Sequence, residues 1–187
     1  MGFESCFGID IRWAALDPAG LEHCRIEAVS DGVTIRSVLV GGRGGRDYGI
    51  SYTIRCDETW AVQSFSVEDV GGIRLSMRRQ DDGWVGADEA HDTRFDGASL
   101  IDLAGTPFTN TLAIRALPDQ HESTSAAFRV VYVPFDDLAP ILDQQRYTVV
   151  EPYRSYHYAA VDRSFEVMLP VDRSAIVKDY PGMFRRL

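Results

Sequence analysis

TPFTNTLAIRAL, residues 106–117, has the pattern of a helix, whereas the sequence on either side of it has the pattern of strands. Thr106 suits the N-cap, Pro107 suits the first helical position, and Pro118 ends the element. Apolar residues occupy nearly every side of the predicted helix, and a helix of this kind lies in a protein interior rather than on a surface. We therefore expect one buried helix over residues 106–117.

The rest of the sequence has the two-residue period of strands with one buried face. Ile73, Leu75 and Met77 alternate with polar residues, and so do Phe65 and Val67. Turn-forming residues separate such runs at intervals of roughly ten to fifteen residues, as in a meandering antiparallel sheet. The predicted strands cover residues 9–16, 21–29, 32–40, 46–56, 61–69, 72–80, 100–104, 127–133, 145–151, 155–161, 164–171 and 175–179.

This number of strands exceeds what a small sandwich holds, so the sheet must curl or close on itself. No linker or internal repeat divides the chain, which is short enough for one domain. We predict a mainly β fold in a single domain, residues 1–187, with a long curved antiparallel sheet wrapped around a single central helix.

Composition excludes several classes of function. The net charge of −9 works against binding to nucleic acids, which depends on Lys and Arg residues that neutralise phosphates. No stretch approaches the roughly 20 apolar residues that cross a bilayer, and residues 1–10 lack the pattern of a signal peptide. Cys6, Cys24 and Cys56 form no C-x-x-C pair, so we expect reduced thiols and a cytoplasmic protein.

The sequence shows no pattern that requires a metal or a cofactor. Asp88, Glu89, His91 and Asp92 lack the spacing of a metal-binding loop, and we interpret them as a solvated acidic loop. The G-x-S-x-G pattern of a nucleophilic serine is absent. We predict no catalytic residue, no metal and no cofactor.

An enzyme acting on an apolar substrate, such as a hydratase or an isomerase, is the alternative. It would use Asp102, Asp179 or a histidine, and it requires a titratable group with a perturbed pKa inside a pocket.

Arg115 and the tryptophans leave several interpretations open. An unpaired Arg115 inside the protein would cost several kcal/mol, so it must reach solvent, pair with a carboxylate such as Asp102, or meet an anionic ligand. Trp60 and Trp84 lie on or beside predicted strands, where they pack in the core or line an apolar cavity.

Residues 106–117 also resemble the motif TPFTNTLPIRRL, which recurs in a family of bacterial proteins described as putative glycolipid-binding proteins. The similarity extends from about residue 10 to the end of the chain. Further matching stretches are DETW at 57–60, GW at 83–84, DL at 102–103, QRYT at 145–148, VD at 171–172 and VKDYPGMFR at 177–185. The resemblance implies a spiral β-roll around one helix, assembled as a homodimer.

The resemblance also implies binding or carriage of a glycolipid or another amphiphilic lipid, without catalysis. The residues predicted to contact the ligand are Trp60, Trp84, Asp102, Phe108, Asn110, Arg115 and Tyr147. Ala113 stands where the family motif has Pro, which favours a straighter helix. Ala116 stands where the motif has a second Arg, which weakens any site for an anionic headgroup.

A structural or interaction protein is a further alternative, with a fully packed roll that acts as a dimer. A helix is about 10–12 Å across with its side chains, and it must share the interior with any lipid. If Phe108, Leu112, Ile114 and Leu117 fill the roll, no acyl chain can lie inside it. A cavity would favour binding, whereas a completely packed interior would favour the structural role.

Overall fold

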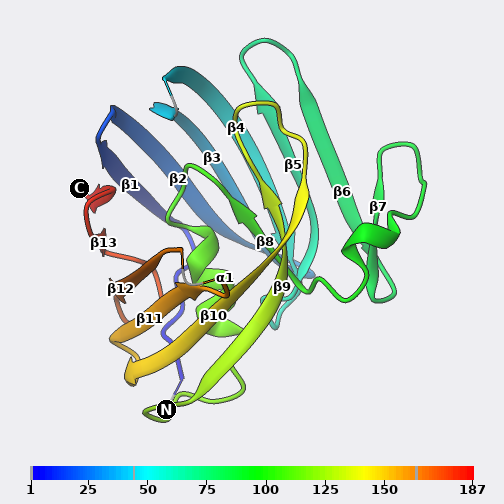
Figure 1. Ribbon diagram of the computed structural model, residues 1–187. Coiled ribbons are helices and arrows are strands. Elements are labelled where there is room, and N and C mark those ends of the chain that lie inside the picture. Colours follow the sequence, from blue (N-terminus) through cyan, green and yellow to red (C-terminus); the bar gives the residue numbers. More distant parts are fainter. Residues whose placement is uncertain (1, 44, 163) are drawn as a thin grey trace.

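The computed structural model describes residues 2–43, 45–162 and 164–187, which form two β-sheets and one α-helix (Figure 1). The mainly β fold with a single α-helix is therefore confirmed for the described residues. Sheet A contains, in chain order, β1 (Ile9–Leu16), β2 (Ala19–Val29), β3 (Gly32–Arg43), β4 (Arg46–Cys56), β5 (Val62–Asp69), β6 (Arg74–Gln80), β7 (Gly83–Gly86), β13 (Asp179–Tyr180) and β14 (Phe184–Arg186). Sheet B contains β8 (Leu100–Leu103), β9 (Ser125–Val133), β10 (Ile141–Glu151), β11 (Ser155–Ala160) and β12 (Glu166–Pro170).

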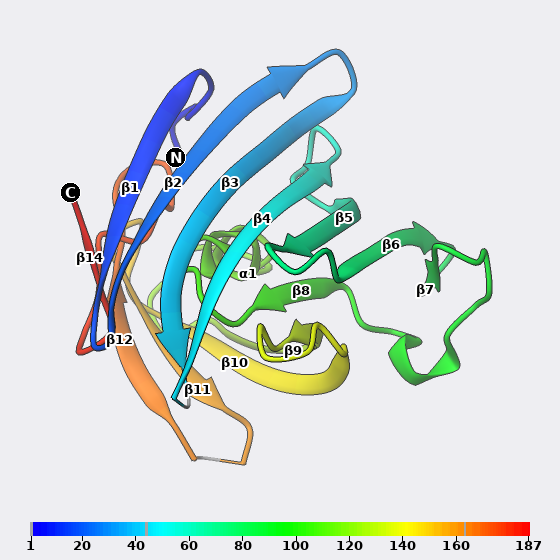
Figure 2. The ribbon, with the colours of Figure 1, turned by 90° about the horizontal axis from the view of Figure 1, so that it is seen from above.

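Sheet A is strongly curved and has the shape of half a barrel (Figure 2). Its nine strands follow the order β13-β14-β1-β2-β3-β4-β5-β6-β7. The C-terminal strands β13 and β14 come first in this order because β14 pairs with β1. Helix α1 (Thr109–Arg115) and sheet B lie on the concave side of this sheet (Figure 2). The side chains on the concave side therefore meet those of the helix and of sheet B.

The period of two in the sequence corresponds to the two faces of the strands. In β3, Ile35, Ser37 and Leu39 are buried, while Arg36 and Val38 between them are exposed. Strands β2, β4 and β5 show the same alternation. Burial of one face of each strand builds a continuous hydrophobic core along the inside of sheet A.

Helix α1 covers Thr109–Arg115 and is shorter than the predicted range 106–117. Phe108, and not Thr106, occupies the N-cap position. The Thr106 hydroxyl instead accepts a hydrogen bond from the Phe108 backbone N–H at 3.0 Å, which stabilises a turn ahead of the helix. All residues from Thr109 to Ile114 are buried, as the apolar pattern predicted.

Strands β8 and β9 run parallel, although the turn pattern predicted an antiparallel meander. The chain passes from β8 through α1 before it enters β9, and a parallel pair requires such a crossover in place of a tight hairpin. The other paired strands of both sheets are antiparallel.

The strand predicted at 175–179 is wrong for most of its length. The Asp172 carboxylate accepts hydrogen bonds from the backbone N–H groups of Ser174 at 2.9 Å and Ile176 at 3.0 Å. These bonds hold a turn, in which Ala175 has a φ of 63°, so the chain cannot extend there. Strands β7 and β14 were not predicted, because four and three residues are too few to show an alternation.

Candidate functional site

A cavity of about 330 Å³ lies between sheet B and the strands β13 and β14 of sheet A. We call it the Asp102 cavity. Thr106 and Asn110, from the helix segment, line it together with Asp102 of β8 and Arg43 at the end of β3. Five aromatic residues also line it, namely Tyr132, Tyr158, Phe165, Tyr180 and Phe184. Elements that are far apart in the sequence therefore build one wall.

Strand β10 of sheet B contributes Asp143 to the wall, and two further side chains lie on the same face of the strand. Asp143, Gln145 and Tyr147 are two residues apart, so their side chains point to the same face of the sheet. Tyr158 of β11 lies directly opposite Tyr147 in the antiparallel register, and the two rings meet edge to face with their centres 5.3 Å apart. This face of sheet B is thus both aromatic and polar.

Asp102 joins the cavity wall to helix α1. Its Oδ1 atom accepts a hydrogen bond from the Thr109 hydroxyl at 2.8 Å, and its Oδ2 atom accepts one from the Gln145 amide at 2.7 Å. Burial raises the pKa of the Asp102 carboxyl, while these two hydrogen bonds favour the ionised form and oppose the increase. Asp102 is therefore a half-buried acceptor held in a fixed orientation.

Asn110 and Tyr147 form a second link between the helix and sheet B. The Tyr147 hydroxyl donates to Asn110 Oδ1 at 2.9 Å, and Asn110 Nδ2 donates to the Pro107 carbonyl at 3.1 Å. Asn110 lines the cavity, whereas Tyr147 lies behind it and is only 2% exposed. Tyr147 therefore positions the wall and does not contribute to its surface.

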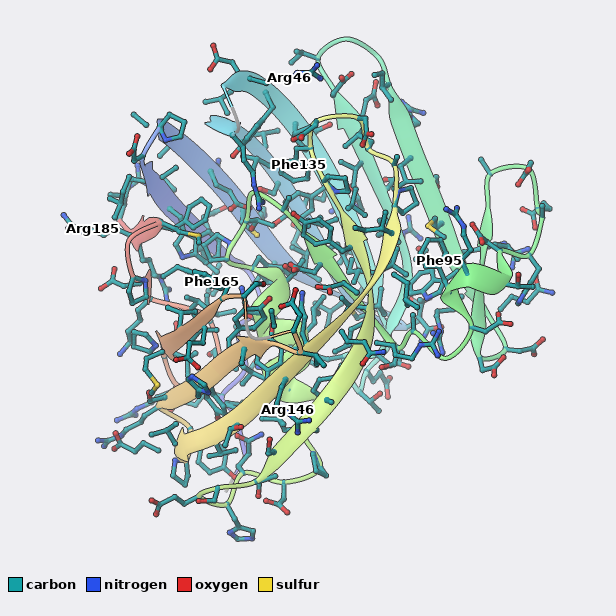
Figure 3. The ribbon with its side chains drawn as sticks, viewed as in Figure 1. Arg46, Phe95, Phe135, Arg146, Phe165 and Arg185 are labelled. Atoms are coloured by element: carbon teal, nitrogen blue, oxygen red, sulfur yellow. The ribbon has the colours of Figure 1, made fainter. Side chains whose placement is uncertain are left out.

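Four of the five aromatic residues of the cavity form a contiguous row. The ring centre of Phe165 lies 6.0 Å from that of Tyr158 and 6.2 Å from that of Tyr180, and Phe165 is labelled in Figure 3. Tyr180 in turn meets Phe184 edge to face, with the ring centres 6.2 Å apart. The row runs from sheet B to the C-terminal strands and gives the cavity one apolar side.

A buried carboxyl group lies next to this site on sheet A. Glu22 Oε1 accepts hydrogen bonds from the hydroxyls of Ser37 at 2.7 Å, Tyr52 at 2.7 Å and Thr106 at 2.9 Å. Its Oε2 atom is buried without a hydrogen-bond partner. Burial raises the pKa of Glu22 to about 7, although the three hydrogen bonds oppose the increase. Thr106 thus connects the cavity wall to a carboxyl group that titrates near neutral pH.

The polar residues of the helix segment bond to different parts of the protein. Thr106 bonds to sheet A through Glu22, whereas Thr109 and Asn110 bond to sheet B. The Thr111 hydroxyl donates to the carbonyl of Ala175 at 3.0 Å, in the segment that follows β12. These side chains are buried, so each hydrogen bond fixes the helix against one neighbour.

Arg115 and Trp60 lie outside the Asp102 cavity and contact each other. The Arg115 guanidinium carbon is 4.0 Å from the centre of the Trp60 ring and 5.1 Å from that of Phe3. Its Nη2 atom donates to the carbonyl of Ser174 at 2.9 Å. Of the interpretations for Arg115, the structure supports neither an ion pair with Asp102 nor a place in this cavity. Burial lowers the pKa of Arg115, and its partners are aromatic rings, carbonyl groups and the Cys6 thiol.

Trp84 and Phe108 belong to the hydrophobic core and are fully buried. The Trp84 indole N–H donates to the Ala98 carbonyl at 2.9 Å, and its ring meets the ring of Phe65 with centres 5.5 Å apart. Neither Trp84 nor Phe108 lines the Asp102 cavity. Of the seven residues predicted to contact a ligand, Asp102 and Asn110 line this cavity, and Tyr147 supports it.

Sequence reasoning missed most residues of the wall. The spacing of Asp143, Gln145 and Tyr147 could have placed Asp143 beside the predicted Tyr147. Tyr180 and Phe184 belong to the closing VKDYPGMFR stretch, but nothing in that stretch shows what their rings face. Glu22 lies on the same face of β2 as the buried Cys24 and Ile26, yet an acidic residue in a strand is expected to face water.

Within residues 2–43, 45–162 and 164–187, no helix is long and apolar enough to cross a membrane. The same residues contain no group of three or more His, Cys, Asp or Glu side chains placed to hold a metal ion.

Comparison with known proteins places this chain in a family. A family described as "Putative glycolipid-binding" matches residues 10–186. The chain belongs to this family. It is also similar to the crystal structure of a DUF1089 family protein from Pseudomonas aeruginosa, with 31% sequence identity and a TM-score of 0.77. That similarity covers 89% of this chain and 92% of the other. A comparison with curated proteins gives no match.

Proposed function

We propose that this member of the family binds a glycolipid or a related amphiphile, with the sugar headgroup in the Asp102 cavity. The observation that carries the proposal is the composition of the wall, which combines a row of aromatic rings with fixed polar groups. Sugars present apolar C–H faces that pack on rings, and hydroxyl groups that need acceptors such as Asp102 and Asn110. Membership of the family supports the same class of ligand.

The size of the cavity limits which part of an amphiphile it can hold. A volume of about 330 Å³ is at the lower end of the range of small-molecule sites. The apolar residues of the helix segment, Phe108, Leu112, Ile114 and Leu117, are buried in the core and do not line the cavity. We infer that the cavity takes the headgroup and that an acyl chain remains outside the packed interior around α1.

Binding without catalysis is also part of the proposal. The enzyme alternative requires a titratable group in a pocket, and Asp102 is such a group, whereas Asp179 and the four histidines do not line the cavity. Both oxygens of Asp102 accept hydrogen bonds from Thr109 and Gln145. This arrangement favours a role as a fixed acceptor over proton transfer. Incubation with alkyl glycosides and analysis for released sugar tests it, and any release above the background contradicts it.

Phe165→Ala is expected to weaken binding of octyl glucoside about tenfold, because it removes a ring from the middle of the aromatic row. Isothermal titration calorimetry, below the concentration at which the glycoside forms micelles, measures the dissociation constant. Phe7→Ala is the matched control, since Phe7 is 45% exposed and does not line the cavity. Absence of binding by the unmodified protein would contradict the proposed function.

We further propose a cytoplasmic homodimer and a spiral β-roll with α1 at its centre. The buried free thiols of Cys6, Cys24 and Cys56 support a reducing compartment. An apolar groove of about 440 Å³ on the outer face of β2–β4, with exposed Val38 and Val40, offers a surface for a second copy. Cell fractionation and sedimentation of the purified protein test these points, and a monomer at micromolar concentration contradicts the dimer.

A further inference from the structure

We propose that the headgroup bound in the Asp102 cavity carries a positive charge, as the ammonium group of an amino sugar does. This inference rests on the proposed function and narrows its ligand from sugars in general to amine-bearing sugars. It follows from the charges, the hydrogen bonds and the aromatic rings of the cavity wall.

The wall carries more negative than positive charge. Asp102, Asp143 and Asp162 contribute carboxyl groups, while Arg43 is the one cationic residue of the wall among the described residues. Hydrogen bonds from Ser164 lower the pKa of Asp162 and so keep that carboxylate ionised. A headgroup that enters this cavity meets an excess of carboxylates, which attract a cation and repel an anion.

Arg43 offsets only part of this charge, since one guanidinium faces three carboxyl groups. The Arg43 Nη1 atom donates to the carbonyl of Ala104 at 3.1 Å. The Arg43 guanidinium also forms a hydrogen bond with the Tyr132 hydroxyl. Burial raises the pKa of Tyr132, whereas this bond opposes the increase less strongly. Arg115, the cation of helix α1, lies against Trp60 and Ser174 outside the cavity. Arg43 is therefore already hydrogen-bonded within the wall, and Arg115 is directed elsewhere.

Two of the carboxylates, Asp102 and Asp143, share a hydrogen-bond donor. The Gln145 amide nitrogen donates to Asp102 Oδ2 at 2.7 Å and to Asp143 Oδ2 at 3.3 Å, so the two carboxylates share one neutral donor. Like charges in such proximity destabilise each other unless a cation lies between or beside them. An ammonium group, with three N–H donors and a full positive charge, supplies what the single amide donor lacks.

The aromatic row favours the same kind of group. The electron-rich faces of Tyr158, Phe165 and Tyr180 attract cations, and ammonium groups bind in protein cavities lined by such rings. A neutral sugar also packs on these rings, but it gains nothing from the excess of carboxylates. An acidic sugar packs on them as well, and the carboxylates repel it.

A series of octyl glycosides with one tail and three headgroups tests the proposal. At pH 7 the amine-bearing octyl 2-amino-2-deoxyglucoside is expected to bind about tenfold more tightly than octyl glucoside, and octyl glucuronide more weakly than both. N-acetylation of the amine, which removes the charge, should return the affinity to that of octyl glucoside. Added salt should reduce the difference between the charged and the neutral ligands.

Asp143→Asn should remove most of the preference for the amine over octyl glucoside, measured as the ratio of the two dissociation constants. Asp137→Asn is the matched control, because Asp137 is an exposed carboxylate that does not line the cavity. Equal binding of the amine and of octyl glucoside, or a preference that Asp143→Asn leaves intact, would overturn this inference while the proposed function stands. Failure of all three glycosides to bind would instead overturn the proposed function.

Discussion

Glu22 is expected to lower the free energy of unfolding of the unmodified protein by about 3 kcal/mol as the pH rises from 4.5 to 7, and Glu22→Gln is expected to remove this decrease. The pKa of Glu22 is raised by burial to about 7 in the folded protein, against an ordinary value of 4.5. Between these two values the folded state binds a proton that the unfolded state has released. The stabilisation is therefore complete below pH 4.5 and is lost as the pH rises through 7.

Gln is a suitable replacement because it resembles the protonated form of Glu22. Its carbonyl oxygen can accept the hydrogen bonds that Ser37, Tyr52 and Thr106 donate to Oε1, and it carries no charge. Above pH 7, the unmodified protein must hold a buried carboxylate whose Oε2 atom has no partner. We expect Glu22→Gln to be the more stable protein at pH 8 and the two to be similar at pH 5.

Urea unfolding at pH 5 and pH 8 measures the effect of Glu22→Gln. Glu27→Gln is the matched control, since Glu27 lies in the same strand but is paired with Arg25 and Arg36 near the surface. The control should follow the pH dependence of the unmodified protein. Parallel pH profiles for Glu22→Gln and the unmodified protein would show that Glu22 is ionised across this range and would refute the expected result.

Trp60→Ala is expected to lower the free energy of unfolding by about 3–5 kcal/mol, as truncation of a buried aromatic side chain does. Trp60 is 8% exposed, and its ring lies under the Arg115 guanidinium at 4.0 Å. Its removal opens a space in the core and leaves a half-buried cation without the ring that contacts it. Arg115 Nε already lacks a hydrogen-bond partner, so the ring is one of its main contacts.

A double-mutant cycle separates the loss of packing from the loss of the cation–π contact. Arg115→Met keeps an apolar side chain of similar length without the charge, and the cycle with Trp60→Ala should give a coupling energy of about 1–2 kcal/mol. Urea unfolding measures all four proteins. Phe7→Ala, at an exposed aromatic residue, should change stability by less than about 0.5 kcal/mol. A coupling energy near zero would contradict the role of the contact.

The strands could be predicted because apolar residues recur at every second position in a strand that buries one face. Isolated runs such as 72–80 were found for this reason, and β6 covers most of that range. The helix was predicted too long, because Thr106 looks like an N-cap in sequence but caps a turn ahead of α1. Residues 175–179 look like a strand until the side chain of Asp172 is seen to hold a turn.

The cavity could be predicted only in part, because its wall is assembled from separate elements. Asp102 and Asn110 were found through the helix motif and its neighbouring strand. Asp143 and Tyr180 reach the same cavity from β10 and β13, and no local pattern shows that these strands converge. Glu22 was missed for a related reason, since its three donors lie 15, 30 and 84 residues away in the sequence.

The hydrogen bonds of Thr106, Thr109, Asn110 and Thr111 have a consequence for how relatives of this protein should be compared. Together these hydrogen bonds hold the helix segment against both sheets and against the segment after β12. A chain that shares the motif is expected to make the same hydrogen bonds whatever ligand it binds, because these bonds position the helix within the fold. Differences in ligand should instead be sought at positions such as Asp143 and Phe165, which the motif does not contain.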